Sequence, residues 1–510
     1  MFRQTLLAAL CLALPAAAAE VRFDGAYRLG FVDVSSLTLD DSGFATGQKS
    51  YLQHRLRLTP KLNELDDKGG GIEIQGSVDI FSGLISGDTA ADFRGFGNVG
   101  LSRQDGFSAN GFTFRHLFAQ IRFPTGVLEF GQMPADWGMG MLINGGDGEN
   151  VTDFGDPSFG DIVDRVLFAS RPFGGLFGPG NSLGRDLALA VAADVVYSDR
   201  YASLVTGTAG SLQWADTAFE ALGAIIYDPG QNTRADLYIS RRVQTYAQSA
   251  GDLHFWTFDL HYRHANAIQG LGGMMLSIEG EAAELFGGTS HSPNLTFTGN
   301  STRISQQGAV LRVLGAKNAI EGELEGGYAS GDANPFDDQS NGFQMSRDYK
   351  VGLVLFDQVM LFQSQNAARR LSDPKLFGKP PQGLDLLPTE GAVTNALYLK
   401  PTVRWKPRLG NGSFKIVASA LFARAPQPYV DPYQTFVTSQ ALNSYGHGAG
   451  QNYGVELDGA VGYTARLAEL MGFEASIQGG YLLPGDAFTL QTGARMPGQK
   501  AIRLRATFTF

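Results

Sequence analysis

Ionisable side chains at alternate positions of short stretches are the groups in this 510-residue chain that could do chemistry. One stretch carries Glu321, Glu323 and Glu325, and the final stretch carries Arg503 and Arg505. Alternate residues of a β-strand point to the same side, so each charged row would face one surface and the apolar residues between would face the other. Such rows indicate the attraction and passage of polar solutes rather than covalent chemistry.

We predict that charged rows of this kind line the interior of a closed sheet. Joining the last strand to the first would place Arg503 and Arg505 beside Arg22 and Arg28 in a basic arc, with the glutamate rows on the opposite wall. Opposed arcs would produce a transverse electric field that favours small or charged solutes. The alternative is that these charges form internal ion pairs in a filled barrel. The predicted pore-lining residues are Arg22, Arg28, Arg55, Arg57, Arg242, Arg263, Glu279, Glu281, Glu321, Glu323, Glu325, Lys400, Arg404, Glu456, Asp458, Arg503 and Arg505.

Enzymatic and metal chemistry find little support in the sequence. His254, His261 and His264 share one stretch, but the G-x-S-x-G elbow of a serine hydrolase does not occur. Acidic segments at 146–156 and 332–338 offer oxygen ligands without the spacing of an EF-hand calcium loop. We therefore predict no catalytic residue, no metal site and no cofactor.

The first 19 residues have the pattern of a Sec-type signal peptide. Arg3 precedes an apolar run at 6–14, and small residues at Ala17 and Ala19 suit cleavage before Glu20. A membrane anchor is the weaker alternative, because a spanning helix needs about 20 apolar residues. The only cysteine, Cys11, lies in this segment, so the mature chain would contain no disulfide and no cysteine ligand.

The rest of the chain has the composition of a transmembrane β-barrel. Hydrophobic residues make up 43% of the sequence, yet they are dispersed in short alternating runs. A barrel strand needs only about 10 residues with one lipid-facing row. The formal net charge of −10 argues against nucleic acid as a partner. Residues 20–510 contain no linker, so we predict one outer-membrane barrel with lipid as its partner.

The lengths of the connections predict the topology. Short turns at 124–126, 228–232, 316–318 and 408–412 alternate with long connections at 84–111, 135–160, 286–303, 330–392, 425–452 and 484–499. Short turns are periplasmic and long loops extracellular in such barrels, which predicts about 18 antiparallel strands with both termini in the periplasm. The alternating strand that ends at Phe510 would close the barrel and would be recognised by the barrel assembly machinery.

The segment 330–392 is the longest predicted excursion from the barrel. Within it, residues 349–371 could supply a strand, but a strand there would make the total odd. We predict instead an extracellular excursion, helical in the second half of 349–371, that folds over or into the barrel mouth and constricts the pore. The strand alternative stays open, because short apolar runs do not discriminate well.

Three segments resemble the alginate-export type of outer-membrane barrel. They are GGYASGDANPFDD at 326–338, YGVELD at 453–458 and GGYLLPGDAF at 479–488. The resemblance implies an 18-stranded porin-like exporter of polysaccharide whose electropositive pore is constricted by loops. Here the predicted interior mixes acidic and basic rows, which departs from a uniformly basic pore.

Together these patterns predict an outer-membrane channel that passes or exports polar or anionic solutes, with polysaccharide among the candidate solutes and periplasmic export proteins among the candidate partners. The alternative function is a structural or docking barrel of an envelope machine with a plugged lumen.

Overall fold

The computed structural model describes residues 20–65, 70–87, 112–146, 153–155, 160–178, 180–203, 216–230, 232–246, 251–268, 272–290, 301–373, 375 and 383–510. The predicted signal peptide, residues 1–19, lies outside the described residues, as do most of the predicted loop at 84–111 and most of the acidic segment at 146–156.

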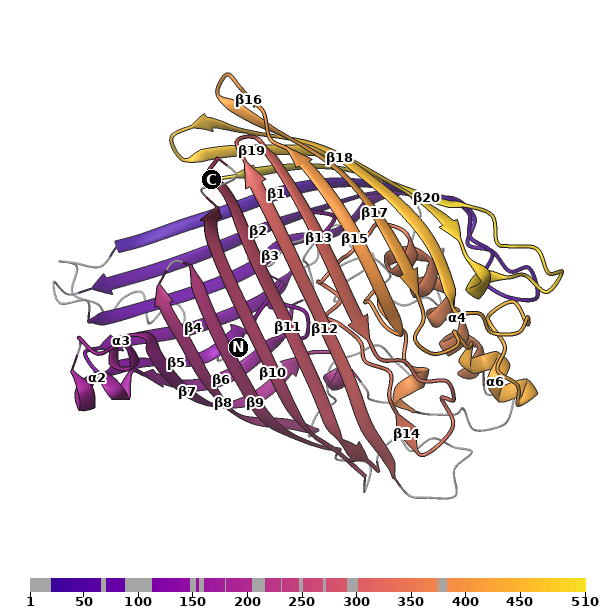
Figure 1. The fold of residues 1–510 in the computed structure, drawn as a ribbon, viewed down its shortest axis with the longest axis horizontal. Coiled ribbons are helices and arrows are strands. Elements are labelled where there is room, and N and C mark those ends of the chain that lie inside the picture. The colour runs from indigo at the N-terminus through magenta and orange to yellow at the C-terminus, as the bar shows by residue number, and fades with distance from the viewer. Residues whose placement is uncertain are drawn as a thin grey trace.

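The described chain forms one closed antiparallel barrel of 18 strands, as predicted (Figure 1). Each strand pairs with its sequence neighbours, and pairing of the last strand with the first closes the ring. The barrel strands are β1 (Glu20–Val34), β2 (Lys49–Leu65), β3 (Gly71–Gly87), β4 (Thr113–Phe123), β5 (Gly126–Pro134), β6 (Ile162–Ser170), β7 (Leu187–Ser198), β8 (Thr217–Gly230), β9 (Thr233–Thr245), β10 (Asp252–Ile268), β11 (Met274–Thr289), β12 (Thr302–Lys317), β13 (Ile320–Ala329), β15 (Ala396–Trp405), β17 (Gly412–Arg424), β18 (Asn452–Ala468), β19 (Met471–Pro484) and β20 (Gln499–Thr509).

The seam lies where the closing strand was predicted. Strand β20 pairs with β1 from Ala26 opposite Thr509 to Val34 opposite Ala501. Phe510 extends this pairing, because its backbone N–H donates to the carbonyl of Gly25 at 2.9 Å and its carbonyl accepts from the Gly25 N–H at 2.7 Å. A Cβ on Gly25 would lie 2.4 Å from the Phe510 ring, so any other residue here would displace this terminal aromatic ring.

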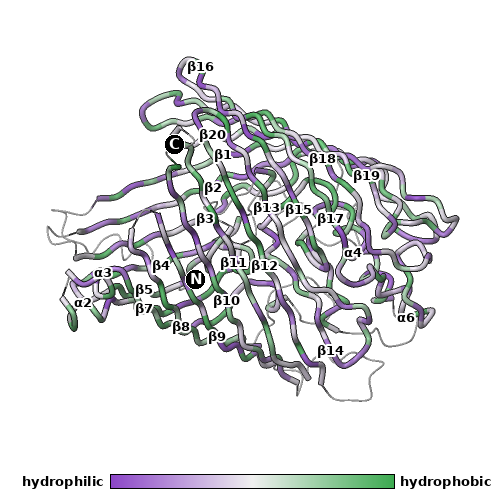
Figure 2. The backbone as a smooth tube through the Cα atoms, viewed as in Figure 1, coloured by the Kyte–Doolittle hydropathy of each residue, from purple (hydrophilic) through white to green (hydrophobic). Residues whose placement is uncertain are grey.

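Hydrophobic and hydrophilic residues alternate along the barrel strands (Figure 2), and the large hydrophobic side chains of one row are exposed while many polar side chains of the other row are buried. Strand β15 shows the inversion most clearly, since Leu397, Val403 and Trp405 are about half exposed while Lys400 and Thr402 are buried. A soluble protein would bury the first set and expose the second. The pattern is that of a wall whose outer face meets hydrocarbon and whose inner face meets polar groups.

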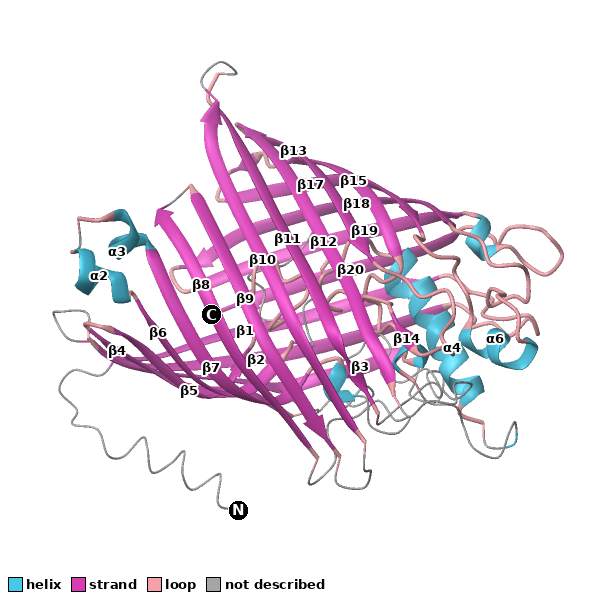
Figure 3. Cartoon of the chain, turned by 60° about the horizontal axis from the view of Figure 1, so that its bottom comes forward, coloured by secondary structure: helices cyan, strands magenta, loops and turns pink. Residues whose placement is uncertain are grey.

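Connections of different length lie at opposite ends of the barrel. All four predicted short turns join strands at one end, called here the turn end. The other end, the loop end, carries the long connections with helices α4 (Leu361–Leu371) and α6 (Pro432–Thr438) (Figure 3). The turn end holds one larger connection, between β6 and β7, with helices α2 (Pro172–Phe177) and α3 (Ser182–Asp186). Among the described residues, no helix is long and apolar enough to cross a membrane.

The connection between β13 and β15, residues 330–395, is called here the excursion. It contains β14 (Gln339–Ser340), the π-helix η4 (Leu355–Met360), α4 and the 3-10 helix η5 (Leu384–Leu386). Residues 355–371 are thus helical, and the segment supplies no barrel strand. Its apolar side chains, such as Val354 at 0% exposed, pack in one cluster with inward-facing Leu285, Leu421 and Leu482. The excursion therefore fills the barrel interior at the loop end.

Another connection at the loop end was not anticipated as a long loop. Residues 35–48, between β1 and β2, pack Leu37 and Leu39 into the same apolar cluster. Asp40 in this loop accepts a hydrogen bond from the Asn366 side chain of α4 at 3.0 Å. The loop thereby fixes α4 from the side of the seam.

Candidate functional site

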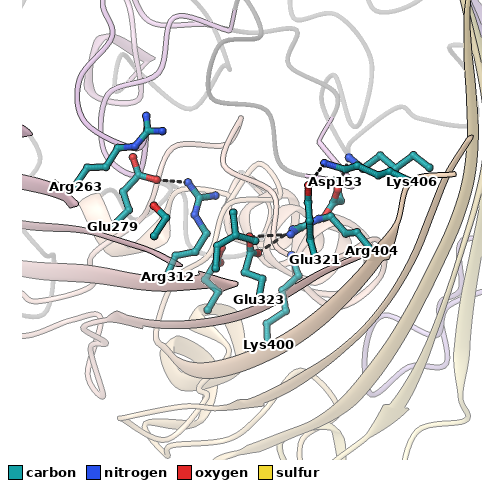
Figure 4. Close-up of a pocket in the computed structure, with 13 residues that line it drawn as sticks. Asp153, Arg263, Glu279, Arg312, Glu321, Glu323, Lys400, Arg404 and Lys406 are labelled. Carbon is teal, nitrogen blue, oxygen red and sulfur yellow. Dashed lines mark hydrogen bonds and ion pairs between the residues drawn. The ribbon is translucent and has the colours of Figure 1, made fainter. Parts of the chain in front are cut away.

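A cavity of about 360 Å³ lies against the inner wall formed by β10 to β13, β15 and β17, in the turn-end half of the barrel (Figure 4). Nearly all of its lining side chains are charged, and we call this surface the charged wall. It comprises Asp153, Arg263, Ser277, Glu279, Arg312, Leu314, Glu321, Glu323, Glu325, Lys400, Arg404, Lys406 and Lys415.

Arg404 is the centre of the charged wall. Its guanidinium donates to both carboxylate oxygens of Glu323, at 3.0 and 2.9 Å, and its Nη2 lies 2.6 Å from Oδ2 of Asp153. Strand pairing explains the first contact, since β15 runs antiparallel to β13 and places Thr402 opposite Glu323, two residues from Arg404. A bidentate pair fixes the orientation of the guanidinium as well as its charge. Arg404 thus joins the wall to a loop.

Asp153 belongs to the connection between β5 and β6, which reaches across the interior. Its second oxygen lies 2.5 Å from Nζ of Lys415. Burial alone would raise the pKa of this carboxyl, but hydrogen bonds and charges from Arg404 and Lys415 outweigh burial and lower the pKa to about 2. Asp153 is therefore ionised at any physiological pH and holds its loop to the wall.

The same short loop segment also contacts the seam. The carbonyl of Phe154 accepts from Arg503 Nη1 at 3.1 Å, and the carbonyl of Gly155 accepts from Arg505 Nη2 at 3.2 Å. Residues 153–155 therefore bridge the charged wall and β20, which narrows the interior between them.

A second chain of contacts crosses four strands. Arg312 Nη2 lies 2.6 Å from Glu279, Glu279 contacts His261 Nε2 at 3.3 Å, and His261 Nδ1 contacts Asp236 at 3.1 Å. These residues come from β12, β11, β10 and β9, and each occupies an inward position. His261, considered above as part of a histidine cluster, is thus a member of an ion-pair chain.

Two cations of the charged wall have no carboxylate within ion-pair distance among the residues that the structure describes. Lys400 is 1% exposed, and its ammonium lies 5.5 Å from the centre of the Phe154 ring. Arg263 is exposed to the cavity beside Glu279 (Figure 4). A buried or lumenal cation without a close partner costs free energy unless water or an anion solvates it. These two groups therefore favour water or an anion in the cavity.

Two wall glutamates hold loops instead of facing an open lumen. Glu281 of β11 accepts from the backbone N–H groups of Met139, Met141 and Leu142. A Cβ on Gly138 would lie 2.6 Å from this carboxylate, so the tight approach requires glycine. Residues 139–142 of the connection between β5 and β6 are thereby bound to the inner wall of the barrel.

Glu456 of β18 makes the equivalent contact to the excursion. It accepts from the backbone N–H groups of Leu353, Val354 and Leu355 at 2.6 to 2.7 Å, at the start of η4. Orphan N–H groups at the start of a helix are natural partners for a carboxylate. Glu281 and Glu456 are called here the loop clamps, and both are buried, at 2% and 0% exposed.

The predicted pore-lining residues divide into three groups. Those that line the cavity are Arg263, Glu279, Glu321, Glu323, Glu325, Lys400 and Arg404. Those buried under inward-folded chain or within wall contacts are Arg242, Glu281, Glu456 and Asp458. Those near the seam are Arg22, Arg28, Arg55, Arg57, Arg503 and Arg505.

The predicted opposition of a basic arc and an acidic wall requires correction. Arg57 is bound to Asp79 at 2.7 Å and Arg503 to Asp357 at 3.1 Å, so the arc is partly neutralised. The glutamate rows alternate with cations from neighbouring strands, since Lys406 lies 2.5 Å from Glu321. Charges are neutralised by partners within the same wall, because side chains on neighbouring strands are much closer to one another than side chains on opposite walls.

Sequence reasoning missed Asp153, Arg312, Lys406 and Lys415. Arg312 is the only charge in the apolar stretch 308–316 of β12, and its inward position follows from the alternation with exposed Leu311. Lys406 and Lys415 flank a short turn, where charge usually indicates solvent. No local pattern indicates that Asp153 folds inward. Among the described residues, no group of acidic, histidine or cysteine side chains could hold a metal ion.

Comparison with known proteins gives a fold and no family. No family model matches the chain, and no curated relative matches it. Among solved structures, Pseudomonas aeruginosa OccK9 (OpdG) superimposes with a TM-score of 0.54 at 9% identity, covering 96% of this chain and 98% of that one. Pseudomonas aeruginosa OpdL gives a TM-score of 0.50 at 9% identity, covering 97% and 98%. These likenesses show the porin-like barrel fold and lend no specific support to the alginate-export type, so the comparisons establish that the chain is similar in fold to these barrels.

Proposed function

We propose that this protein is an outer-membrane channel for small polar or anionic solutes. The observation that carries the proposal is the cavity on the charged wall, where Lys400 and Arg263 lie without an ion-pair partner among the described residues. A barrel that served only as a scaffold would have no need to keep cations of this kind inside. The apolar outer face and the porin-like fold support an outer-membrane location.

A docking barrel with a plugged lumen is the second candidate, and the excursion favours it. Residues such as Tyr349, Leu355 and Met360 are 0 to 1% exposed and pack as tightly as a soluble core. Passage of solute would then depend on the space left beside the excursion or on its movement. The alginate-export resemblance suggests polysaccharide as a more specific substrate for the channel. Passage of such a polymer would require the whole excursion to leave the barrel. Small solutes fit the packed loops better.

Planar-bilayer recording of the purified mature protein tests the channel proposal. We expect discrete current steps in potassium chloride, and larger steps after deletion of residues 340–390, because the deleted segment occupies the loop end. A variant with Lys500→Gln, at an outward position of β20, serves as the control for insertion and should match the unmodified protein. Absence of current from both the unmodified and the deleted protein, with circular dichroism showing an intact barrel in each, would refute the channel and favour the docking role.

A further inference from the structure

The connection between β6 and β7 differs from its neighbours at the turn end. Where neighbouring strands are joined by tight turns, residues 171–186 form the two helices α2 and α3 (Figure 3). Ser170 Oγ donates to the carbonyl of Thr125 at 2.6 Å, which fixes the start of the connection beside the turn between β4 and β5. We call residues 171–186 the helical hairpin.

The two helices of the helical hairpin pack closely against each other. A Cβ on Gly184 would lie 2.8 Å from the carbonyl of Gly178 and 3.0 Å from that of Phe173, and one on Gly174 would lie 3.1 Å from the carbonyl of Gly184. The two helices therefore touch through backbone at their glycines. Asn181 caps α3 by accepting from the Leu183 N–H at 2.9 Å. Close packing of this kind fixes which side chains remain outside.

Large apolar side chains are what remain outside. Leu176 is 73% exposed, Phe177 56% and Leu183 49%. These values match those of the barrel's outer face, where Val191 of β7 is 60% exposed. Water would make such a cluster unfavourable by about 25 cal/mol for each Å² of apolar surface. The exposed residues of the helical hairpin therefore extend the outer apolar surface of the wall beyond the ends of the strands.

The position of α3 supports this continuity. The helix contacts β7, which directly follows it in the chain, and β8, which ends at the same rim of the barrel. Arg185 lies close enough to Tyr227 for the two groups to interact electrostatically, and Tyr227 continues the outward row that includes exposed Phe219 and Ile225. The hairpin thus lies on the outer side of the rim rather than over the lumen.

Charge on the hairpin suits a phospholipid headgroup. The segment contains two arginines, Arg171 and Arg185, and one acid, Asp186, which gives a net charge of +1. Arg185 is bound to Asp186 at 2.6 Å yet its side chain is 60% exposed, and Arg171 is exposed. Aromatic and aliphatic side chains next to arginines are the composition found at membrane interfaces, where rings enter the acyl boundary and cations contact phosphates.

We propose that the helical hairpin lies in the interface of the bilayer leaflet at the turn end, with Leu176, Phe177 and Leu183 among the acyl chains and the arginines at the phosphates. This inference rests on the proposed membrane location. The hairpin anchors the rim of the barrel between β6 and β7 to lipid, and its occupant is phospholipid rather than a protein partner.

Site-directed spin labelling in phosphatidylglycerol–phosphatidylcholine vesicles tests this inference. Because Cys11 is the only cysteine and lies within the predicted signal peptide, single-cysteine variants of the mature chain need no prior substitution. The label is placed by Phe177→Cys at the apolar cluster, by Ser182→Cys at an exposed polar position of the same hairpin, and by Val191→Cys on the barrel wall. Leu176→Cys replaces Phe177→Cys if the latter does not fold.

Collision with oxygen and with a water-soluble nickel chelate reports whether each label is in lipid or water. We expect labels at 177 and 191 to be more accessible to oxygen and the label at 182 to be more accessible to nickel. If 191 lies in lipid while 177 is as accessible to nickel as 182, the hairpin inference is overturned and the channel proposal is unaffected. If 191 itself lies in water, the membrane location fails and both proposals fail with it.

Discussion

The two halves of the barrel interior are filled by different means. At the loop end, the excursion brings apolar side chains such as Val354 and Phe356 against the inner wall and buries them almost completely. At the turn end, the charged wall keeps Arg404, Glu323 and their neighbours around a cavity. One half resembles the core of a soluble protein enclosed by a barrel, whereas the other resembles a polar lumen.

The difference shows that wall carboxylates have two uses in one barrel. In the turn-end half, Glu323 neutralises a cation on the next strand. Nearer the loop end, Glu281 and Glu456 instead satisfy three backbone N–H groups each, and so bind loops that the barrel must hold inside. Buried backbone donors need partners as much as charges do. The clamps therefore form the boundary between the packed half and the polar half.

Among the changes that test the difference between the two halves, we expect Glu456→Ala to have the largest effect. The change leaves the N–H groups of Leu353, Val354 and Leu355 without their acceptor, and the loss of a charge-assisted hydrogen bond costs about 1.5–3 kcal/mol each. We expect amide hydrogen exchange of residues 351–361 to accelerate by at least an order of magnitude, while exchange in β10 to β13 stays unchanged.

The matched control for this change is Glu474→Gln, which alters an exposed inward glutamate on the adjacent strand β19. Equal exchange in the Glu456→Ala variant and in the unmodified protein would mean that apolar packing alone holds the excursion. In that case the clamp would mark no boundary between the two halves.

A smaller effect should appear in the pH dependence of the two ends. Burial, only partly offset by hydrogen bonds at the start of α6, raises the pKa of Asp431 at the loop end to about 6. A raised carboxyl pKa favours the folded state at low pH, so this contribution is gained as pH falls from about 6 to about 4. Asp153 on the charged wall has its pKa lowered to about 2, so its contribution is complete above about pH 4 and is lost as pH falls toward 2.

Thermal unfolding of Asp431→Asn and Asp153→Asn, followed by circular dichroism against the unmodified protein, measures both contributions. Asp431→Asn keeps an oxygen that can accept from the Gln434 N–H. We expect it to be more stable than the unmodified protein at pH 8, by up to about 3 kcal/mol, and equal near pH 4. Asp153→Asn should be less stable than the unmodified protein by about 2 kcal/mol at pH 7, and the two proteins should be nearly equal in stability at pH 2. Parallel pH profiles for the two variants would contradict the assignment of opposite electrostatics to the two ends.

The barrel wall was predictable from the sequence because its rules are local. The alternation of Ile502 and Leu504 with Arg503 and Arg505 determined which row of β20 faces outward, and the short turns determined the parity. The same parity argued against a strand within 349–371, where the structure has η4 and α4.

The contents of the barrel were not predictable from the same rules. Asp153 reaches Arg404 across more than 250 residues of sequence, and Glu456 reaches η4 across about 100, so neither contact leaves a periodic pattern. Glu456 and Glu323 look alike in sequence, both on inward rows, yet one holds a loop and the other a cation. Their difference depends on which chain folds against them, and that is set by the packing of the excursion.

The smallest expected effect concerns Lys400, and it addresses whether the polar half contains a solute path at all. Lys400→Met removes the charge but keeps an unbranched side chain that can still pack beside Phe154. A unit charge about 8 Å from the path, screened by water, changes the energy of a passing monovalent ion by about 0.5 kcal/mol. The anion loses this energy and the cation gains it, so the ratio of anion to cation permeability should fall about fivefold, measured from the reversal potential across a potassium chloride gradient. Lys500→Met, at an outward position on β20, removes the same charge outside the lumen and should leave the ratio unchanged. An unchanged ratio in Lys400→Met would place the ion path away from the charged wall, because a cation lining the path must act on the ions that pass it.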